Sequence, residues 1–396
     1  MSTKKIQKSI AGMSFVIAGF SVPQAVIAAD SLTEAFSEGK ASLNMRYRYE
    51  SVDDGNSATD DAGAHTLRSR LGFTTGAYKD VKAHIDFEVI NTAGDFNSAT
   101  NGSTSFAKVV DPKDEELNQA FLSYSGISGT EVKVGRQRII LDNARFVGNV
   151  GWRQNEQTFD AIKLTNKSIE DVEITLAQIS QINTITGSDI DSSHTLFNVG
   201  VDKTPVGKVS AYAYLLDYDA TTADTNTLGA RMKGGAGSLL YTVEYAQQSD
   251  AGDNPANISA SYMFAEGGYK LDKTKVFLGY ESLGSDDGTY GFQTPLATKH
   301  AFNGWADKFL ATPANGLNDT YVKVVSKIAG MKVVGTYHDY SSDEGSIDYG
   351  TELNIVLIKP INKTFKGLVK YADYSADAYS TDTQKVWLSL QANFNQ

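Results

Sequence analysis

Two kinds of side chain alternate along the segments 43–50, 81–89 and 386–394, and this period of two limits the fold more than any other feature of the sequence. One face of each segment is apolar and the other is mostly polar. Such alternation over about nine residues is typical of a β-strand with one apolar and one wet face. Strands of soluble sandwiches also alternate, but they average about five or six residues, whereas membrane strands need about 9–11. The lengths here favour membrane strands.

The alternation is clear at both ends of the chain and weaker in the middle, and it predicts an all-β fold with eighteen strands. Sixteen is the alternative if weak segments such as 130–137 and 158–165 do not span a membrane. The predicted strands are 41–51, 66–76, 81–92, 116–125, 130–137, 158–165, 171–180, 195–203, 207–218, 226–234, 238–248, 257–271, 273–283, 319–328, 331–341, 349–359, 364–374 and 384–394.

The connections between these segments alternate between long and short. Long connections lie near 52–65, 93–115, 138–157, 181–194, 219–225, 249–256, 284–318, 342–348 and 375–383, with shorter ones between them. Outer-membrane barrels have short periplasmic turns and longer extracellular loops. Because every backbone N–H and C=O must be paired in lipid, only helices and closed barrels can span it. The sequence therefore predicts a transmembrane antiparallel β-barrel with both termini on the periplasmic side.

The first 29 residues resemble a secretory signal peptide. Three lysines near the start are followed by an apolar stretch at 10–20 and by small residues at 28–29. An uncleaved anchor is the alternative, but the apolar stretch is too short to cross about 30 Å of hydrocarbon. We expect cleavage after Ala28 or Ala29, leaving 30–396 as one barrel domain. No later apolar run is long enough for a transmembrane helix, so a helical membrane protein is excluded.

Composition narrows the possible functions. The chain has no cysteine, which excludes disulfides and thiol-ligated metals, and no motif points to a cofactor. Its formal net charge is −11, which argues against nucleic acid as a partner. Acidic residues cluster at 53–54, 60–61, 114–116 and 286–287, all in predicted long loops. The five histidines form no recognisable catalytic motif, so we do not expect an enzyme; a barrel hydrolase that uses Ser and His stays as a minor alternative.

Arginine is concentrated in the first part of the mature chain, where eight of the nine arginines lie between positions 46 and 153. Four of them fall on the polar faces of two neighbouring strands, where they are expected to stand side by side in the lumen. Guanidinium groups suit carboxylates and phosphates. The alternative is a structural ladder of ion pairs with Glu50, Asp86 and Glu88. The predicted pore-lining residues are Arg46, Arg48, Arg68, Arg70, Lys82, Asp86, Glu88, Arg136, Arg138, Arg145 and Arg153.

Two of the long connections contain more apolar residues than a plain surface loop. The connection 138–157 includes Ile139, Phe146 and Trp152, and 284–318 contains four aromatic rings and His300 within a short stretch. Exposed apolar groups of this size are seldom left in water, and long ordered loops are often functional. Both connections are therefore predicted to fold onto the barrel or into its lumen.

The same two regions carry motifs that resemble the alginate-export family of outer-membrane porins. The first region reads GRQ at 135–137, RFVG at 145–148, WRQ at 152–154 and FDA at 159–161. The second reads GYESL at 279–283, FQTPLATKH at 292–300 and GWADKF at 304–309. The resemblance implies an eighteen-stranded barrel and an arginine-rich path for an acidic polysaccharide or other anions. The chain departs from the common pattern at its end, where Asn395 and Gln396 follow Phe394.

These observations lead to a functional hypothesis and two alternatives. The first is an outer-membrane channel for passive diffusion or export of anionic solutes in a Gram-negative bacterium, with outer-membrane lipid and lipopolysaccharide as its surroundings. The second is a structural or adhesive barrel whose lumen is plugged by loops. The third is the barrel hydrolase. A measured single-channel conductance separates the first from the second.

Overall fold

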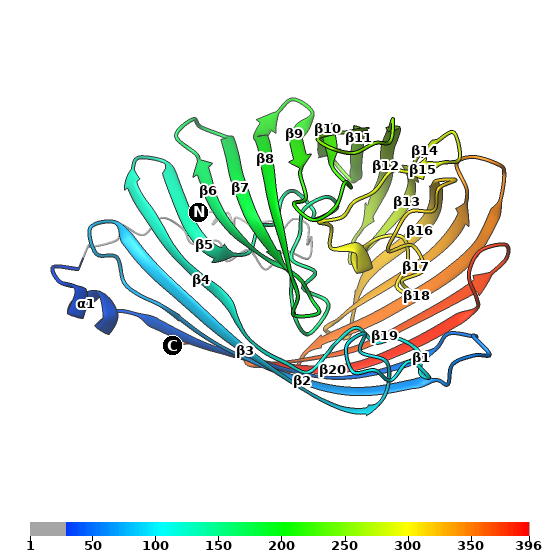
Figure 1. Ribbon diagram of the computed structural model, residues 1–396, viewed down its shortest axis with the longest axis horizontal. Coiled ribbons are helices and arrows are strands. Elements are labelled where there is room, and N and C mark those ends of the chain that lie inside the picture. The colour runs from blue at the N-terminus through cyan, green and yellow to red at the C-terminus, as the bar shows by residue number, and fades with distance from the viewer. Residues whose placement is uncertain (1–28, 396) are drawn as a thin grey trace, which may run out of the picture.

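The computed structural model describes residues 29–395, in which eighteen long strands form one antiparallel sheet (Figure 1). The sheet closes on itself because the first strand pairs with both the second and the last. The strands are β1 (Lys40–Asp53), β2 (Ala62–Thr74), β3 (Val81–Asp95), β4 (Asp114–Ile127), β5 (Thr130–Gln137), β6 (Thr158–Asn166), β7 (Val172–Asn183), β8 (Asp189–Thr204), β9 (Gly207–Leu216), β10 (Thr225–Ala236), β11 (Leu239–Asp250), β12 (Ser259–Leu271), β13 (Thr274–Leu283), β16 (Leu317–Ile328), β17 (Met331–Ser341), β18 (Asp348–Pro360), β19 (Phe365–Ala376) and β20 (Thr383–Asn395).

Four short elements complete the fold. They are α1 (Leu32–Ser37), the hairpin of β14 (Ser285–Asp286) and β15 (Tyr290–Gly291), and the 3-10 helix η1 (Lys299–Ala301). Figure 1 shows α1 outside the ring of strands, next to the start of β1. No helix within residues 29–395 is long and apolar enough to cross a membrane. The predicted signal segment lies almost wholly outside the described residues, so its cleavage stays a prediction.

The predicted number of strands is confirmed, and the weak segments 130–137 and 158–165 are the full strands β5 and β6. The prediction of a long loop near 181–194 is wrong. Strand β8 begins at Asp189, so that only 184–188 connects β7 to β8. The acidic cluster 114–116 was also expected in a loop, but it opens β4. Both errors have one cause: polar residues can extend a strand beyond the lipid, where alternation no longer reveals it.

The two faces of the wall follow the predicted alternation. On β3, Phe87 is 51% exposed on the lipid side, while its neighbours Asp86 and Glu88 are buried on the inner side. Slipping this strand by one residue would turn both carboxylates towards lipid. A basic group at the bilayer midplane costs about 2–4 kcal/mol, and an acidic group somewhat less. The register is therefore fixed by which side chains tolerate hydrocarbon.

The interior of the barrel is occupied by the two connections that sequence analysis singled out, 138–157 and the central part of 284–316. Figure 1 shows the yellow stretch around residue 300 inside the ring of strands. Phe146 and Phe292 from these connections pack against Tyr212 and Tyr262 of the wall in one buried apolar cluster. The prediction that both connections fold onto the barrel or into its lumen is confirmed, and the lumen is where they lie. We call them the first and second inner loops.

Candidate pore constriction

The arginines of β1 and β2 lie together on the inner face of the wall. The register places Arg46 directly opposite Arg68. Arg48 lies opposite Thr66 and Arg70 opposite Asn44, so that they flank this pair on its two sides. All four side chains are buried, with exposed fractions between 1% and 9%. Like charges placed directly opposite one another destabilise a sheet. Their proximity therefore requires nearby carboxylates or other acceptors.

Carboxylates from two directions supply part of that compensation. Arg70 pairs with Glu88 of β3, and Arg68 lies 3.8 Å from the same carboxylate. Arg48 lies 3.3 Å from Asp111, which belongs to the extracellular connection 96–113. These contacts form much of the ion-pair ladder that sequence analysis weighed as the alternative role of the arginines. Glu50 was expected in the same ladder, but it pairs with a residue of the first inner loop.

Backbone and amide groups of the first inner loop bind the remaining arginine donors. Arg46 donates from Nε to Oε1 of Gln154 at 2.8 Å and from Nη1 to the carbonyl oxygen of Gly151 at 3.0 Å. The guanidinium of Arg48 lies 4.1 Å from the ring centre of Trp152. Arg46, Arg48, Arg68 and Arg70, which we call the arginine stripe, thus also form the surface to which this loop binds.

Glu156 is the most highly bonded side chain of the first inner loop. Its carboxylate lies 2.8 Å from Nη1 of Arg70 and 2.7 Å from Nε of Arg138, and it accepts from Nδ2 of Asn118 at 2.8 Å. Burial opposes ionisation of Glu156, but the charges of Arg138 and Arg70 outweigh it and hold its pKa well below the ordinary value of about 4.5. The carboxylate is therefore ionised and acts as a fixed counter-charge in the lumen.

The second inner loop is bonded to the first one and to the opposite wall. Gly148 N–H donates to the carbonyl oxygen of Leu296 at 2.9 Å. Arg145 of the first loop pairs with Glu281 of β13 at 2.6 Å. Arg153 pairs with Glu50 at 3.2 Å on β1 and with Asp307 at 3.1 Å in the second loop. Arg145 therefore connects the first loop to the wall, and Arg153 connects the first loop both to the wall and to the second loop.

All three tryptophans of the chain meet at one lysine. Nζ of Lys370, on β19, lies 4.0 Å from the ring centre of Trp152, 3.8 Å from that of Trp305 and 5.1 Å from that of Trp387. It also donates to Nε2 of His300 at 2.6 Å. Each inner loop contributes one indole, and the wall contributes the third. Tryptophan fluorescence therefore reports whether both loops are seated.

The charge of Glu156 leads to a pH prediction. Because the pKa of Glu156 is lowered in the folded barrel, its contribution to loop docking is complete above its ordinary pKa and is lost only as the pH falls below it. Burial also lowers the pKa of His300, which keeps that ring neutral. We therefore expect the difference in tryptophan fluorescence between the wild type and a Glu156→Gln variant to stay constant between about pH 8 and about pH 5 and to diminish only in stronger acid. Loss of that difference already at pH 5 would contradict this account.

Two of the predicted pore-lining residues lie apart from the arginine stripe, and a third, Arg138, is joined to it through Glu156. Arg136 shares the lipid-facing side of the sheet with Val134, and it pairs with Asp160 at 2.8 Å. Lys82 faces inward but near the periplasmic end of β3. Arg138 faces inward, and its side chain is 33% exposed. Arg136 therefore does not face the lumen, whereas Lys82 belongs to a larger group of lysines on the inner face.

That larger group was missed in the sequence. Nine lysines occupy inward-facing positions of the strands close to the short turns, and we call them the lysine collar. They are Lys82, Lys133, Lys163, Lys208, Lys233, Lys275, Lys323, Lys332 and Lys366. Lys133 stands opposite Lys163, and Lys208 stands opposite Lys233. A lysine on the polar face near a short turn is a signal that the sequence alone already contained.

Comparison with known proteins agrees with this architecture. The model of the alginate export family matches residues 39–282, which is more than half of the chain. No curated protein matches the sequence significantly.

Several solved structures share the fold. OccAB4 of Acinetobacter baumannii is 16% identical, with a TM-score of 0.69 over 92% of this chain and 100% of that chain. The outer membrane protein OpdK from Pseudomonas aeruginosa is 12% identical, with a TM-score of 0.70 over 91% of this chain and 100% of that chain. OpdK solved with vanillate is 14% identical, with a TM-score of 0.69 and the same coverage. These likenesses show the closed eighteen-stranded barrel.

Proposed function

The chain belongs to the alginate-export family and is an outer-membrane β-barrel channel, and from this premise we propose that it passes anionic solutes, with acidic oligo- or polysaccharides as the candidate class. The pathway runs past the arginine stripe and the two inner loops and then past the lysine collar. Charged groups lining a pore set its selectivity, and Arg or Lys favours anions. The observation that carries the proposal is the number of cationic side chains on the inner face at two separate levels.

The proposed lining differs in detail from the residues expected at first. Arg46, Arg48, Arg68 and Arg70 act on passing ions mainly through their electrostatic field, because many of their N–H groups already donate to acceptors of the protein. Arg138 is the accessible member of this group. The lysine collar extends the same sign of charge towards the periplasm. In a narrow pore with low-dielectric walls such charges act more strongly than in bulk water.

A plugged barrel is the alternative that has a specific observation in its favour. The inner loops bond to the wall on many sides, as Asp142 does with Asn198 on β8 at 2.7 Å, and Gln248 on β11 with the carbonyl oxygen of Gln293 at 3.0 Å. Reconstitution in a planar bilayer separates the two: a channel gives discrete conductance steps, and a plugged barrel gives none. The hydrolase alternative has no comparable support.

Ion selectivity tests the proposed function. We expect the wild-type channel to prefer anions under a salt gradient, and the preference to weaken at high salt because screening shortens the reach of fixed charges. Replacing Arg46, Arg48, Arg68 and Arg70 together by Ser removes these partners of Asp86, Glu88 and Asp111, so the reversal potential is expected to move towards cation preference.

A single Arg136→Ser variant is the control, because it removes an arginine from the outer face, and it should leave the reversal potential unchanged. Cation preference in the wild type, or an unchanged reversal potential in the fourfold variant, would reduce the arginines to a structural ladder.

A further inference from the structure

The two ends of the barrel carry opposite charge. Five of the extracellular connections, 54–61, 217–224, 251–258, 342–347 and 377–382, contain acidic residues and no lysine or arginine. At the periplasmic end the inner face carries the lysine collar. The formal negative charge of the chain is thus not spread evenly along the barrel axis.

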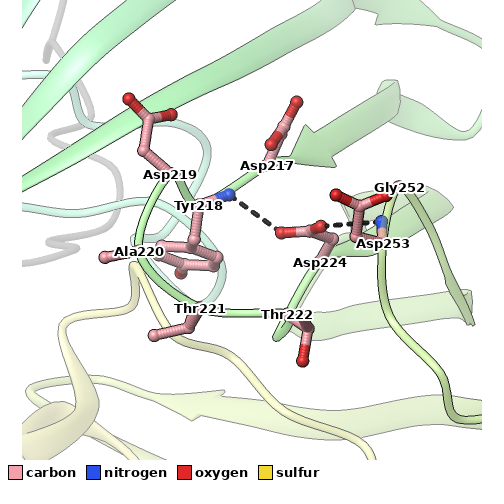
Figure 2. A pocket seen from close by; sticks show the side chains of 9 residues that line it. All are labelled: Asp217, Tyr218, Asp219, Ala220, Thr221, Thr222, Asp224, Gly252 and Asp253. Atoms are coloured by element: carbon pink, nitrogen blue, oxygen red, sulfur yellow. Dashed lines mark hydrogen bonds between the residues drawn. The ribbon is translucent and has the colours of Figure 1, made fainter.

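A hollow of about 420 Å³ between two of these connections shows the acidic end in detail (Figure 2). Asp217, Asp219, Asp224 and Asp253 all line it, and no basic side chain does. Among these four aspartates, Asp224 is the one whose carboxylate accepts hydrogen bonds from the backbone of the hollow, from Tyr218 N–H at 2.8 Å and from Asp253 N–H at 3.2 Å. Asp217, Asp219 and Asp253 are exposed, so their charge acts on ions that approach the mouth.

The collar is far enough from the acidic loops to act separately. A β-strand rises about 3.3 Å per residue, so the strands of 10 to 13 residues between the two zones hold them apart by more than the Debye length of about 10 Å at 0.1 M salt. Ion pairs of Lys133 with Glu131 at 3.4 Å and of Lys208 with Asp202 at 2.8 Å do not remove the excess, because the collar has more cations than acidic partners. Each end therefore concentrates its own counter-ion.

From this arrangement we infer that the channel is a bipolar, rectifying pore, an inference that rests on the proposed function. When the extracellular side is positive, cations enter through the acidic end and anions enter through the collar. Both accumulate between the two zones and the current is high. The opposite voltage draws both ions out of the pore and the current falls. In the conducting state, anions thus enter the pore from the periplasmic end.

Current–voltage curves from single channels of known orientation test this. Because the chain has no cysteine, Ser57→Cys in the connection 54–61 can be labelled with a charged thiol reagent from one chamber to identify the extracellular side. At about 0.1 M salt we expect at least a twofold larger current when that side is positive, and a ratio near one at about 1 M, where the Debye length is about 3 Å.

A triple variant examines the role of the collar. Lys163→Gln, Lys275→Gln and Lys366→Gln together remove three of the nine positive charges of the collar and should lower the current ratio towards one. The control replaces Lys167, Lys203 and Lys363 by Gln, which removes the same charge from outside the lumen, and should keep the wild-type ratio. A linear current–voltage curve in the wild type contradicts only the bipolar pore. Complete absence of current contradicts the proposed function, and this inference with it.

Discussion

A Glu156→Gln variant is expected to release the first inner loop from the wall and to raise the single-channel conductance several-fold. The substitution keeps the size of the side chain but removes the charge that pairs with Arg70 and Arg138. Removing one partner of a buried ion pair costs about 3–5 kcal/mol, because the other charge stays buried. The cost falls on the part of the loop next to Glu156, whose other contacts are the hydrogen bonds of Gln154 and the ion pairs of Arg153, and it is large beside the about 0.5–1.5 kcal/mol of a single hydrogen bond.

Trypsin provides an independent readout for this variant. In the folded barrel Arg145 and Arg153 are buried, and trypsin should not reach them. Once the loop has left its seat, cleavage after either arginine should occur while the strands stay intact. Glu173→Gln is the matched control, since its pair with Lys167 is exposed and surface pairs contribute about 0–1 kcal/mol. If Glu156→Gln keeps the wild-type conductance and resists trypsin, the apolar cluster alone holds the loop.

A Gly304→Ala variant should have a comparable effect through the second inner loop. Gly304 adopts φ +86°, and a Cβ atom there would lie 2.1 Å from Oε2 of Glu352 and 2.4 Å from the hydroxyl of Tyr340. Glu352 accepts from the backbone N–H of Trp305 and of Ala306 next to this glycine. The added methyl group must displace either the Glu352 carboxylate or the loop, and each movement breaks the hydrogen bonds that this carboxylate accepts from Trp305 and Ala306. We expect Trp305 to leave Lys370, with a red shift of fluorescence and a higher conductance.

Gly237→Ala separates the steric clash from backbone strain. Gly237 has φ +61°, and a Cβ there would meet no atom within 4 Å. Both substitutions therefore incur the strain of a left-handed conformation, about 1–2 kcal/mol, but only Gly304→Ala incurs the clash. Gly237→Ala should keep wild-type fluorescence and conductance. Equal behaviour of the two variants would mean that the contact with Glu352 and Tyr340 does not hold the loop in place.

Much of the barrel was predictable because its signals are local. Alternation identified every long strand, including β5 and β6, since the requirement that one face meets lipid acts on each residue separately. The apolar content of 138–157 predicted that this loop folds inward, which is also a local property. Arg136 shows the limit of such reasoning: it was assigned to the lumen by its place in an arginine-rich region, although its parity with Val134 puts it on the other face.

The sequence by itself determined the barrel, its two faces and the two loops that enter it, because period and composition are properties of neighbouring residues. Only the tertiary structure decided which partners the charges take. Arg153 and Asp307 are 154 positions apart, and Glu156 meets both Arg70 and Arg138. No spacing along the chain encodes these pairs. They exist because closing the sheet brings β1, β2 and both loops into one lumen, where a buried charge must find a partner.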